Sequence, residues 1–305
     1  MSKRIILLAG PTASGKSKLA IKIAKKIKGE IINADSMQVY KDFSVLSSRP
    51  SKIDLKKIKH YLYGFQSAKK NFSTGAWLKL VKKQINKCLK NKKIPIIVGG
   101  TGLYFEAITK GISKIPNIDF KTRDKIRKHQ KKIGQKKFYE KLLKLDPLVK
   151  NNIDPSDTQR SIRAYEVKKF TRKSIFKWYK STKSEFKKFQ ILKIFIDTPR
   201  EKLLKNISNR VEQMFKNKCI KEVKFFSTLN IESSLSANKI IGVREIKDFL
   251  SGVLSLEQTK ELINIKTRQY AKRQVTWARG HMIDWDMQYS NSFSSLSKKI
   301  LKVIS

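Results

Sequence analysis

Short apolar runs alternate with amphipathic stretches in the first third of the chain. Residues 4–9, 30–34 and 94–98 are mainly apolar, as in strands of a parallel sheet that are covered on both faces. Apolar residues recur at helical spacing between these runs. Helices are expected at residues 16–28, 77–89 and 103–108. This alternation of strands and helices predicts a doubly wound α/β domain.

The pattern changes after residue 116. Residues 117–189 are rich in lysine, with helical apolar spacing and no strong strand. Residues 191–197 again read as a strand, and the remainder of the chain reads as mostly helical, with a serine-rich loop at 290–297. We therefore expect an α/β core made of residues 1–116 and 190–305, interrupted by a helical insertion domain at 117–189.

Charge and residue counts limit the classes of partner. The 305 residues contain 69 Lys and Arg against 24 Asp and Glu, a net charge of +45. Such a charge favours a polyanionic partner, first nucleic acid and second an anionic membrane, although compositional drift toward lysine is an equal alternative. No segment approaches the ~20 apolar residues of a membrane helix. A soluble, cytoplasmic protein without a membrane partner is expected.

The few cysteines and histidines argue against a structural zinc site. Cys88, Cys219, His60, His129 and His281 are the only residues of these two types, and no two of them have metal-ligand spacing. Two lone cysteines also suit a reducing compartment.

The segment GPTASGKS has the spacing of a phosphate-binding P-loop, and it lies after a predicted strand and before a predicted helix. Backbone N–H groups and the helix N-terminus of such a loop point at phosphate oxygens. Its lysine supplies a positive charge, and the Ser17 hydroxyl is a usual Mg²⁺ ligand. The expected phosphate-binding residues are Gly10, Pro11, Thr12, Ala13, Ser14, Gly15, Lys16 and Ser17.

Two further loops follow predicted strands at the edge where α/β sheets bind ligands. Asp35, just after residues 30–34, is either a general base or metal anchor, or the N-cap of a short helix. Thr101, in the glycine-rich segment 99–102, either donates a hydrogen bond into the site or belongs to a simple turn. The absence of an acidic residue in this segment argues against a motor ATPase.

Arginine is scarce but clustered. Arg160 and Arg163 form one group, and TRQYAKRQVTWAR near the C-terminus interleaves arginines with Tyr270 and Trp277. The planar guanidinium suits bidentate phosphate and base contacts, and aromatic residues among cations are common on nucleic-acid surfaces. The alternative is a basic amphipathic helix with a solvated face.

Five motifs together resemble the bacterial tRNA dimethylallyltransferase family. They are GPTASGKS, DSMQVY (35–40), VGGTGLYF (98–105), DTQRSIRAYEV (157–167) and TRQYAKRQVTW (267–277). The resemblance implies a P-loop NTPase-like parallel sheet flanked by helices, with an inserted all-helical tRNA-binding domain. It also implies transfer of a dimethylallyl group from dimethylallyl diphosphate to N6 of the adenosine 3′ of the anticodon, in tRNAs that read codons starting with U. The P-loop would then hold the donor's diphosphate and not ATP.

The resemblance also implies roles for individual residues. Asp35 would be the general base, Thr101 would orient the amine or the leaving diphosphate, and Arg210 would contact the diphosphate. Mg²⁺ would be the cofactor, the tRNA anticodon stem-loop the partner, and the chain a monomer. The implied tRNA contacts are Asp35, Ser36, Met37, Gln38, Thr101, Arg123, Gln159, Arg160, Ser161, Ile162, Arg163, Gly242, Arg244, Lys272, Arg273, Gln274, Thr276, Trp277 and Arg279.

The chain departs from the family pattern at several positions. SSRP stands at 47–50 in place of a Gly-Thr-Ala-Lys-Pro-like run, and Lys218-Cys219 replaces Gly-Leu. Val243 and Ala278 stand where an aromatic and a larger apolar residue are usual.

Two other functions share some features of this sequence. An ATP-dependent small-molecule kinase shares the loop and sheet but does not account for the basic segments, and a non-catalytic RNA-binding protein leaves Asp35 without a role.

Overall fold

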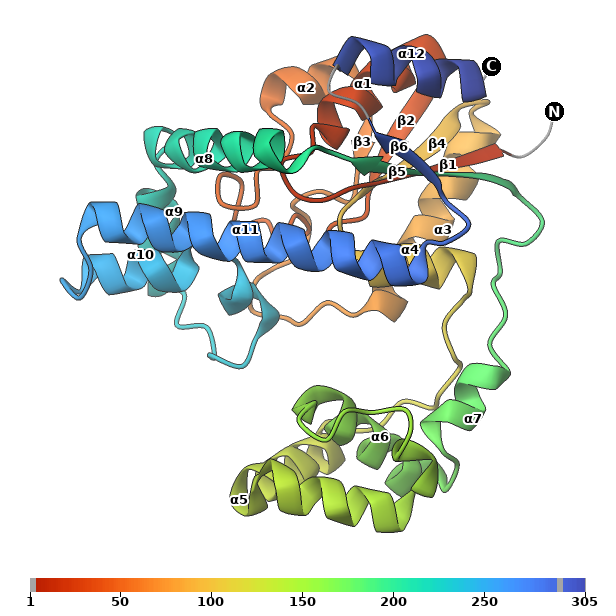
Figure 1. Ribbon diagram of the computed structural model, residues 1–305, viewed down its shortest axis with the longest axis vertical. Coiled ribbons are helices and arrows are strands. Elements are labelled where there is room, and N and C mark those ends of the chain that lie inside the picture. Colours follow the sequence, from red (N-terminus) through yellow and green to blue (C-terminus); the bar gives the residue numbers. More distant parts are fainter. Residues whose placement is uncertain (1–3, 290–292, 305) are drawn as a thin grey trace. The chain divides into compact units, whose positions relative to one another are not determined.

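The computed structural model describes residues 4–289 and 293–304, and its centre is a fully parallel six-stranded sheet (Figure 1). The strand order is β3-β2-β4-β1-β5-β6, and each neighbouring pair is parallel. The strands are β1 (Arg4–Ala9), β2 (Gly29–Asn33), β3 (His60–Tyr61), β4 (Ile94–Gly99), β5 (Gln190–Asp197) and β6 (Asp286–Tyr289). The predicted fold class, a P-loop-like sheet flanked by helices, is confirmed.

Successive side chains of β1 point to opposite faces of the sheet, so each face has its own core. Ile6 and Leu8 pack with α1 (Lys16–Lys26) and α12 (Phe293–Ile304) on one face. Leu7 and Ala9 pack with α3 (Thr74–Lys90) and α4 (Gly102–Thr109) on the other. Because helices cover both faces, the inner strands are mainly apolar, which explains the apolar runs in the sequence.

Four helices form a second core beside the sheet. They are α8 (Arg200–Lys216), α9 (Cys219–Thr228), α10 (Val243–Leu250) and α11 (Leu256–His281). Their apolar faces enclose Val39 and Phe43 from the segment that follows β2, a segment that also carries the short helix α2 (Lys52–Lys57). Helix α11 packs against α8, α10 and α4, so one long helix connects this core to the sheet (Figure 1).

The segment Lys110–Glu185 is a separate compact unit, and the rest of the chain, up to Thr109 and from Phe186 on, is the other. The smaller unit contains α5 (Phe120–Leu145), the 3₁₀ turn Pro147–Val149, α6 (Thr158–Thr171) and α7 (Ile175–Lys180). Buried apolar side chains of α5 and α6, among them Leu142 and Val167, form its core. The structure therefore divides the chain at 109/110 and 185/186, several residues before the expected boundaries of 116/117 and 189/190.

Three elements were not expected from the sequence: α2, β3 and β6. The predicted loop at 290–297 is wrong for residues 293–297, which begin α12, while 290–292 lie outside the described residues. Leu296 and Ile300 of α12 are buried in the core shared with α1, and this packing outweighs the low helix propensity of the preceding serines. Within the described part of the chain, no helix is both long and apolar enough to cross a membrane.

Candidate active site

The P-loop connects the end of β1 to the start of α1. Gly15 has φ of +83°, a backbone conformation that favours glycine, and the helix begins directly after it at Lys16. The Lys16 ammonium turns back over the loop and donates a hydrogen bond to the Pro11 carbonyl at 3.0 Å. The loop is therefore folded with its cation across it, as a phosphate cradle requires.

Two residues of α8 hold the loop from the other side. Arg210 Nη1 donates to Thr12 Oγ1 at 2.8 Å, and Asn206 Nδ2 donates to the Ala13 carbonyl at 3.0 Å. Arg210 Nε and Ser14 Oγ are buried without a hydrogen-bond partner among the described residues. Buried polar atoms are normally paired, so these two are suited to hydrogen-bond an anion that enters the loop.

The electrostatics of the loop favour a negatively charged ligand. Burial lowers the pKa of Lys16 to about 8, with Asp35 opposing and Arg210 adding to the effect. Burial also lowers the pKa of Arg210, and Asp35 again opposes it. Two cations crowded together in a buried site are costly, and a diphosphate would offset that cost.

Asp35 uses one carboxylate oxygen to fix the turn after β2. Its Oδ1 accepts hydrogen bonds from the backbone N–H groups of Met37 at 2.8 Å and Gln38 at 3.3 Å. No helix begins here, so Asp35 caps a turn and is not a helix N-cap. No described residue donates to its Oδ2, which is therefore available to accept a proton.

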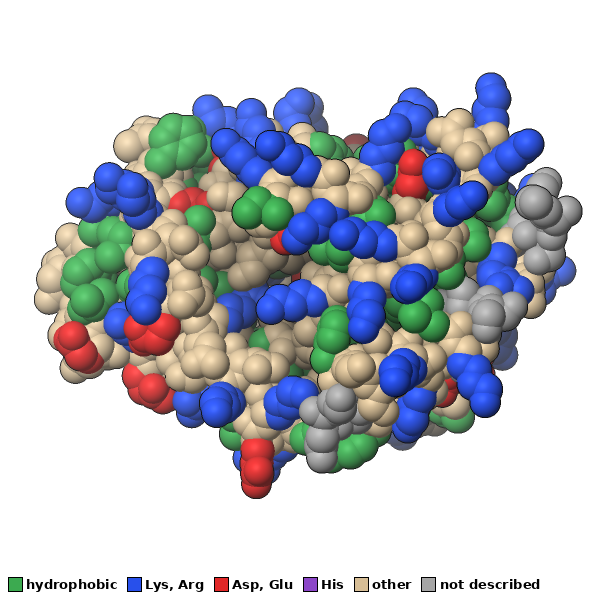
Figure 2. Space-filling model, turned by 90° about the horizontal axis from the view of Figure 1, so that it is seen from above, with side chains coloured by type: hydrophobic (Ala, Val, Ile, Leu, Met, Phe, Trp, Pro, Cys, Tyr) green, Lys and Arg blue, Asp and Glu red, His purple; other side chains and the backbone are tan. Residues whose placement is uncertain are grey.

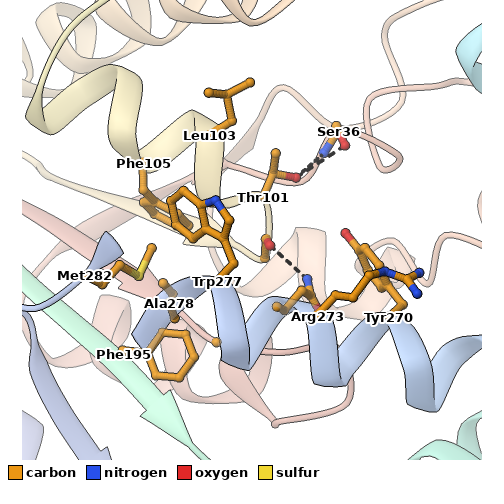
Figure 3. Close-up of a pocket in the computed structure, with 15 residues that line it drawn as sticks. Ser36, Thr101, Leu103, Phe105, Phe195, Tyr270, Arg273, Trp277, Ala278 and Met282 are labelled. Carbon is orange, nitrogen blue, oxygen red and sulfur yellow. Dashed lines mark hydrogen bonds between the residues drawn. The ribbon is translucent and has the colours of Figure 1, made fainter. Parts of the chain in front are cut away.

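Thr101 lies directly beside this turn. Its Oγ1 accepts a hydrogen bond from the Ser36 backbone N–H at 2.9 Å (Figure 3). Its own N–H donates to the Ala34 carbonyl at 3.2 Å. The loops after β2 and β4 are thus joined at the carboxyl edge of the sheet. This is where ligands of open α/β sheets bind.

An apolar pocket of about 240 Å³ adjoins the loops. Figure 3 shows Trp277 and Ala278 of the last turns of α11, and Met282 directly after the helix, lying near Phe105 and Phe195. The lining residues are Ala9, Gly10, Ser36, Gly100, Thr101, Gly102, Leu103, Phe105, Phe195, Tyr270, Arg273, Gln274, Trp277, Ala278 and Met282. The pocket therefore reaches from the P-loop and the Thr101 loop to an apolar wall.

Helix α11 divides its predicted tRNA contacts between two faces. Lys272, Thr276 and Arg279 are exposed and lie outside the pocket lining. Gln274 and Trp277 are half-buried and line the pocket together with the exposed Arg273. The two sets lie on different faces because a helix turns by about 100° per residue.

Other predicted tRNA contacts have structural partners within their own segments. Met37 packs on the second core, and Gln38 Nε2 donates to the carbonyls of Ser47 and Ser48 at 2.9 and 3.0 Å. Gly242 is buried with φ of +102°, whereas the side chain of Arg244, two residues further on, is 82% exposed. Of these four residues, Arg244 is the one whose side chain is most open to a partner.

The helical unit holds the remaining predicted contacts. Gln159 and Arg160 are exposed, and Ile162 is half-buried. The Ser161 side chain is fully buried and its Oγ accepts a hydrogen bond from Gln135 Nε2 at 3.2 Å, so this serine joins α6 to α5 and does not present its hydroxyl to a partner.

Three arginines surround one buried carboxylate in the same unit. Glu166, 2% exposed, lies 3.3 Å from Arg163, 3.7 Å from Arg127 and 3.9 Å from Arg123. Three cations around one anion leave a net positive group on this unit, which suits contact with phosphates.

Several site residues were missed in the sequence. Asn206, Phe195 and Met282 belong to no motif that the sequence analysis names, and Phe105 ends the VGGTGLYF motif without a predicted role. Tyr270, noted in the sequence only as an aromatic residue among cations, lines the pocket. Burial raises the pKa of Tyr270, and the charge of Asp35 adds to the shift. Helical spacing provides one signal that could have found part of this set, since residues 270, 274, 277 and 278 share one face of a helix.

Comparison with known proteins identifies the family. The sequence model of the IPP transferase family matches residues 38–281. A tRNA dimethylallyltransferase of Pelagibacter ubique (strain HTCC1062) is 56% identical over 282 residues, which are 92% of this chain and 90% of that protein. The corresponding enzyme of Rickettsia canadensis (strain McKiel) is 41% identical over 291 residues, or 95% of this chain and 90% of that protein.

Solved structures agree. The tRNA isopentenylpyrophosphate transferase of Bacillus halodurans superposes with a TM-score of 0.72 at 27% identity, covering 99% of this chain and 95% of that one. A eukaryotic dimethylallyltransferase acting on tRNA gives 0.82 at 26% identity, covering 96% and 75% of the two chains. The resemblance seen in the sequence motifs is confirmed, and the chain belongs to the IPP transferase family.

Proposed function

We propose that this chain transfers a dimethylallyl group from dimethylallyl diphosphate to N6 of the adenosine 3′ of the anticodon, in tRNAs that read codons starting with U. One observation carries the proposal: a P-loop with unpaired donors opens beside an apolar pocket, and the turn that carries Asp35 lines the same pocket. A prenyl diphosphate has an anionic end and an apolar end. These two ends match the anion-binding groups and the adjacent apolar wall of the site.

The donor's two ends are assigned to different surfaces. Lys16, Arg210 and the P-loop N–H groups bind the diphosphate, and Phe105, Phe195 and Met282 surround the dimethylallyl group. At roughly 30 Å³ per water-sized group, five carbons need about 150 Å³. This is of the same order as the pocket of about 240 Å³, so the pocket can admit the dimethylallyl group.

The reaction is a substitution at the allylic carbon C1 of the donor. The N6–C1 bond forms while the C1–O bond breaks, and the diphosphate leaves with the bonding electron pair. Asp35 Oδ2 accepts the proton that N6 loses, because an aromatic amine is otherwise a poor nucleophile. Lys16 and Arg210 stabilise the charge that develops on the leaving diphosphate.

Mg²⁺ is proposed as the cofactor, held by the Ser17 hydroxyl. Ser17 is exposed in the first turn of α1, and the described residues contain no cluster of three metal-ligating side chains. A single hydroxyl fits an ion that takes its other ligands from diphosphate oxygens and water. Bound there, Mg²⁺ would neutralise negative charge on the leaving group.

The tRNA anticodon stem-loop is the proposed partner of a monomeric chain. Exposed cationic residues on both units, such as Arg160, Arg244 and Arg279, supply contacts to phosphates. The target adenosine must leave its stack to reach the pocket, and this costs less in a loop than in a duplex.

Nucleoside mass spectrometry tests the proposal. Unmodified tRNA is incubated with the protein, Mg²⁺ and dimethylallyl diphosphate, and the expected product is N6-dimethylallyladenosine at the position 3′ of the anticodon. Asp35→Asn keeps an Oδ1 acceptor for the turn but removes the base, and we expect prenyl transfer to fall about 10²- to 10⁴-fold. Binding of tRNA, measured by filter retention, should remain near that of the unsubstituted protein.

Asp54→Asn is the matched control, since it removes a carboxylate from the exposed start of α2 and should leave transfer unchanged. An equal loss of transfer and tRNA binding in Asp35→Asn would reject Asp35 as the base. Stabilisation of the protein by ATP but not by dimethylallyl diphosphate would reject prenyl transfer itself.

A further inference from the structure

The side-chain amide of Gln274 bridges two loops of the candidate site. Its Nε2 donates a hydrogen bond to the Gly100 carbonyl at 2.8 Å, and its Oε1 accepts one from the Thr12 backbone N–H at 2.8 Å. Gly100 belongs to the loop after β4, and Thr12 belongs to the P-loop. One residue of α11 therefore joins two segments that are otherwise independent in sequence.

The backbone is shaped to let this amide approach. A Cβ atom added at Gly100 would lie 2.2 Å from Gln274 Nε2, which is far below any normal contact. Any other residue at position 100 would displace the amide. Gln and Asn are the side chains that carry a neutral donor and a neutral acceptor on one planar group, and the longer one stands here.

Each end of the bridge is attached to a residue with a role in the proposed reaction. Thr12 also accepts the Arg210 hydrogen bond through its Oγ1, at the diphosphate end. Gly100 directly precedes Thr101, whose Oγ1 holds the Ser36 N–H next to Asp35. The amide thus connects the group that holds the donor to the group that holds the acceptor amine.

We propose that Gln274 is a positioning residue that fixes the P-loop relative to the Thr101–Asp35 loops, and that it is not a tRNA contact. The proposal rests on the function proposed above. Both ends of its amide bond to protein atoms, whereas Lys272 and Thr276 on the exposed face of α11 are open to RNA. A misplacement of about 1 Å between reacting groups can lower the rate about a hundredfold.

Two substitutions separate the effects of the two hydrogen bonds that Gln274 makes. Gln274→Met has similar length and removes both hydrogen bonds. Gln274→Glu keeps an acceptor for the Thr12 N–H but places a carboxylate oxygen against the Gly100 carbonyl. We expect Gln274→Met to lower kcat about a hundredfold, with KM for tRNA and for dimethylallyl diphosphate each within about threefold of the original.

Gln274→Glu should lower kcat as well, because it breaks the hydrogen bond to Gly100, next to Thr101. Gln269→Met is the control: Gln269 is exposed on the same helix, and its replacement should leave kcat unchanged. Hydrogen exchange gives a readout that needs no turnover, since the Thr12 amide should exchange faster in Gln274→Met and at its original rate in Gln269→Met.

Three results would overturn the proposal. One is an unchanged kcat at saturating substrates with a raised KM for tRNA, which would make Gln274 a tRNA contact. The second is unchanged protection of the Thr12 amide in Gln274→Met. The third is an equal fall in kcat for Gln269→Met, which would indicate a general loss of helix stability. Failure of the proposed function is distinct, because the unsubstituted protein would then form no prenylated nucleoside.

Discussion

At the scale of single residues, Lys16 makes donor binding depend on pH. In the free protein this lysine loses its proton as the pH rises through about 8. Bound diphosphate favours the charged ammonium and raises its pKa again, so binding above pH 8 must take up a proton. We therefore expect the affinity for dimethylallyl diphosphate to fall as the pH rises from 8 to 9.

Calorimetry in two buffers with different ionisation enthalpies measures this proton uptake directly. The uptake should be largest between pH 8 and 9, small at pH 6.5, and absent in Lys16→Met. Identical binding enthalpies in the two buffers at pH 8.5 would contradict the assignment of the lowered pKa to Lys16.

Arg160 and Arg163 differ in their surroundings. Substituting each of them should therefore affect tRNA binding and protein stability to different extents. Arg160 is exposed and pairs with Asp157 at the surface, whereas Arg163 lies 3.3 Å from the buried Glu166. We expect Arg160→Ala to reduce the slope of log Kobs against log salt by about 1, with little change in thermal stability.

Arg163→Ala should weaken tRNA binding and also lower the free energy of unfolding by about 1–3 kcal/mol, because Glu166 keeps only two more distant partners. Filter binding at four salt concentrations and urea unfolding provide the two measurements. An unchanged slope for both variants would remove the two arginines from the RNA interface.

Contiguous motifs could be read from the sequence, whereas contacts between distant segments could not. The P-loop and its helix were predicted correctly because their spacing is local. The turn at Asp35 was left with two readings, and the structure shows one oxygen capping the turn and the other unpaired. Phe195 lines the pocket but lies far from every motif along the chain, so its place there depends on tertiary packing.

At the scale of elements, one carboxylate holds the loop that follows β2. Glu222 of α9 accepts hydrogen bonds from the backbone N–H groups of Ser44, Val45 and Leu46. The same loop supplies the carbonyls of Ser47 and Ser48 that hold the Gln38 side chain. A helix outside the pocket thus orders the loop next to the proposed base.

We expect Glu222→Ala to lower the free energy of unfolding by about 2–3 kcal/mol, since it leaves several backbone donors unpaired. Prenyl transfer should fall too, because Gln38 and Asp35 share one turn. Urea unfolding and initial rates provide the measurements. Glu261→Ala, which removes an exposed carboxylate near Arg268, should change stability by less than about 1 kcal/mol. An equal loss of stability in the two variants would show that the hydrogen bonds of Glu222 to the loop after β2 add nothing beyond those of an exposed carboxylate.

The two strands missed in the sequence share a physical reason. Strand β6 has the sequence DMQY and lies at an edge of the sheet, so it lacks the apolar run that marked the inner strands. Strand β3 spans two residues and pairs only with β2. The inner strands were recognised because they are buried on both faces, and edge strands lack that signal.

At the scale of the whole molecule, the basic residues behind the net charge of +45 are spread along the chain and are not gathered in one segment. Figure 2 shows lysine and arginine side chains scattered across one face, with few acidic side chains among them. Contacts to about six to ten phosphates would use only a few of the 69 basic residues. The remaining basic residues contribute to a long-range positive potential that attracts any polyanion.

The salt dependence of tRNA binding distinguishes the basic residues that contact phosphates from the remaining basic residues. If six to ten phosphates are contacted, log Kobs for tRNA should fall with log salt with a slope of about −5 to −9, which weakens binding about 10³- to 10⁵-fold between 50 and 200 mM. The affinity for dimethylallyl diphosphate should change far less, because its binding groups are few and buried. Lys25 is exposed in the last turn of α1, at the end of the helix away from the P-loop. Its charge swap, Lys25→Glu, should leave the slope within about 1 of the original while lowering affinity slightly. A slope near zero would show that the basic surface does not bind the RNA backbone, and the charge would then have to be attributed to composition alone.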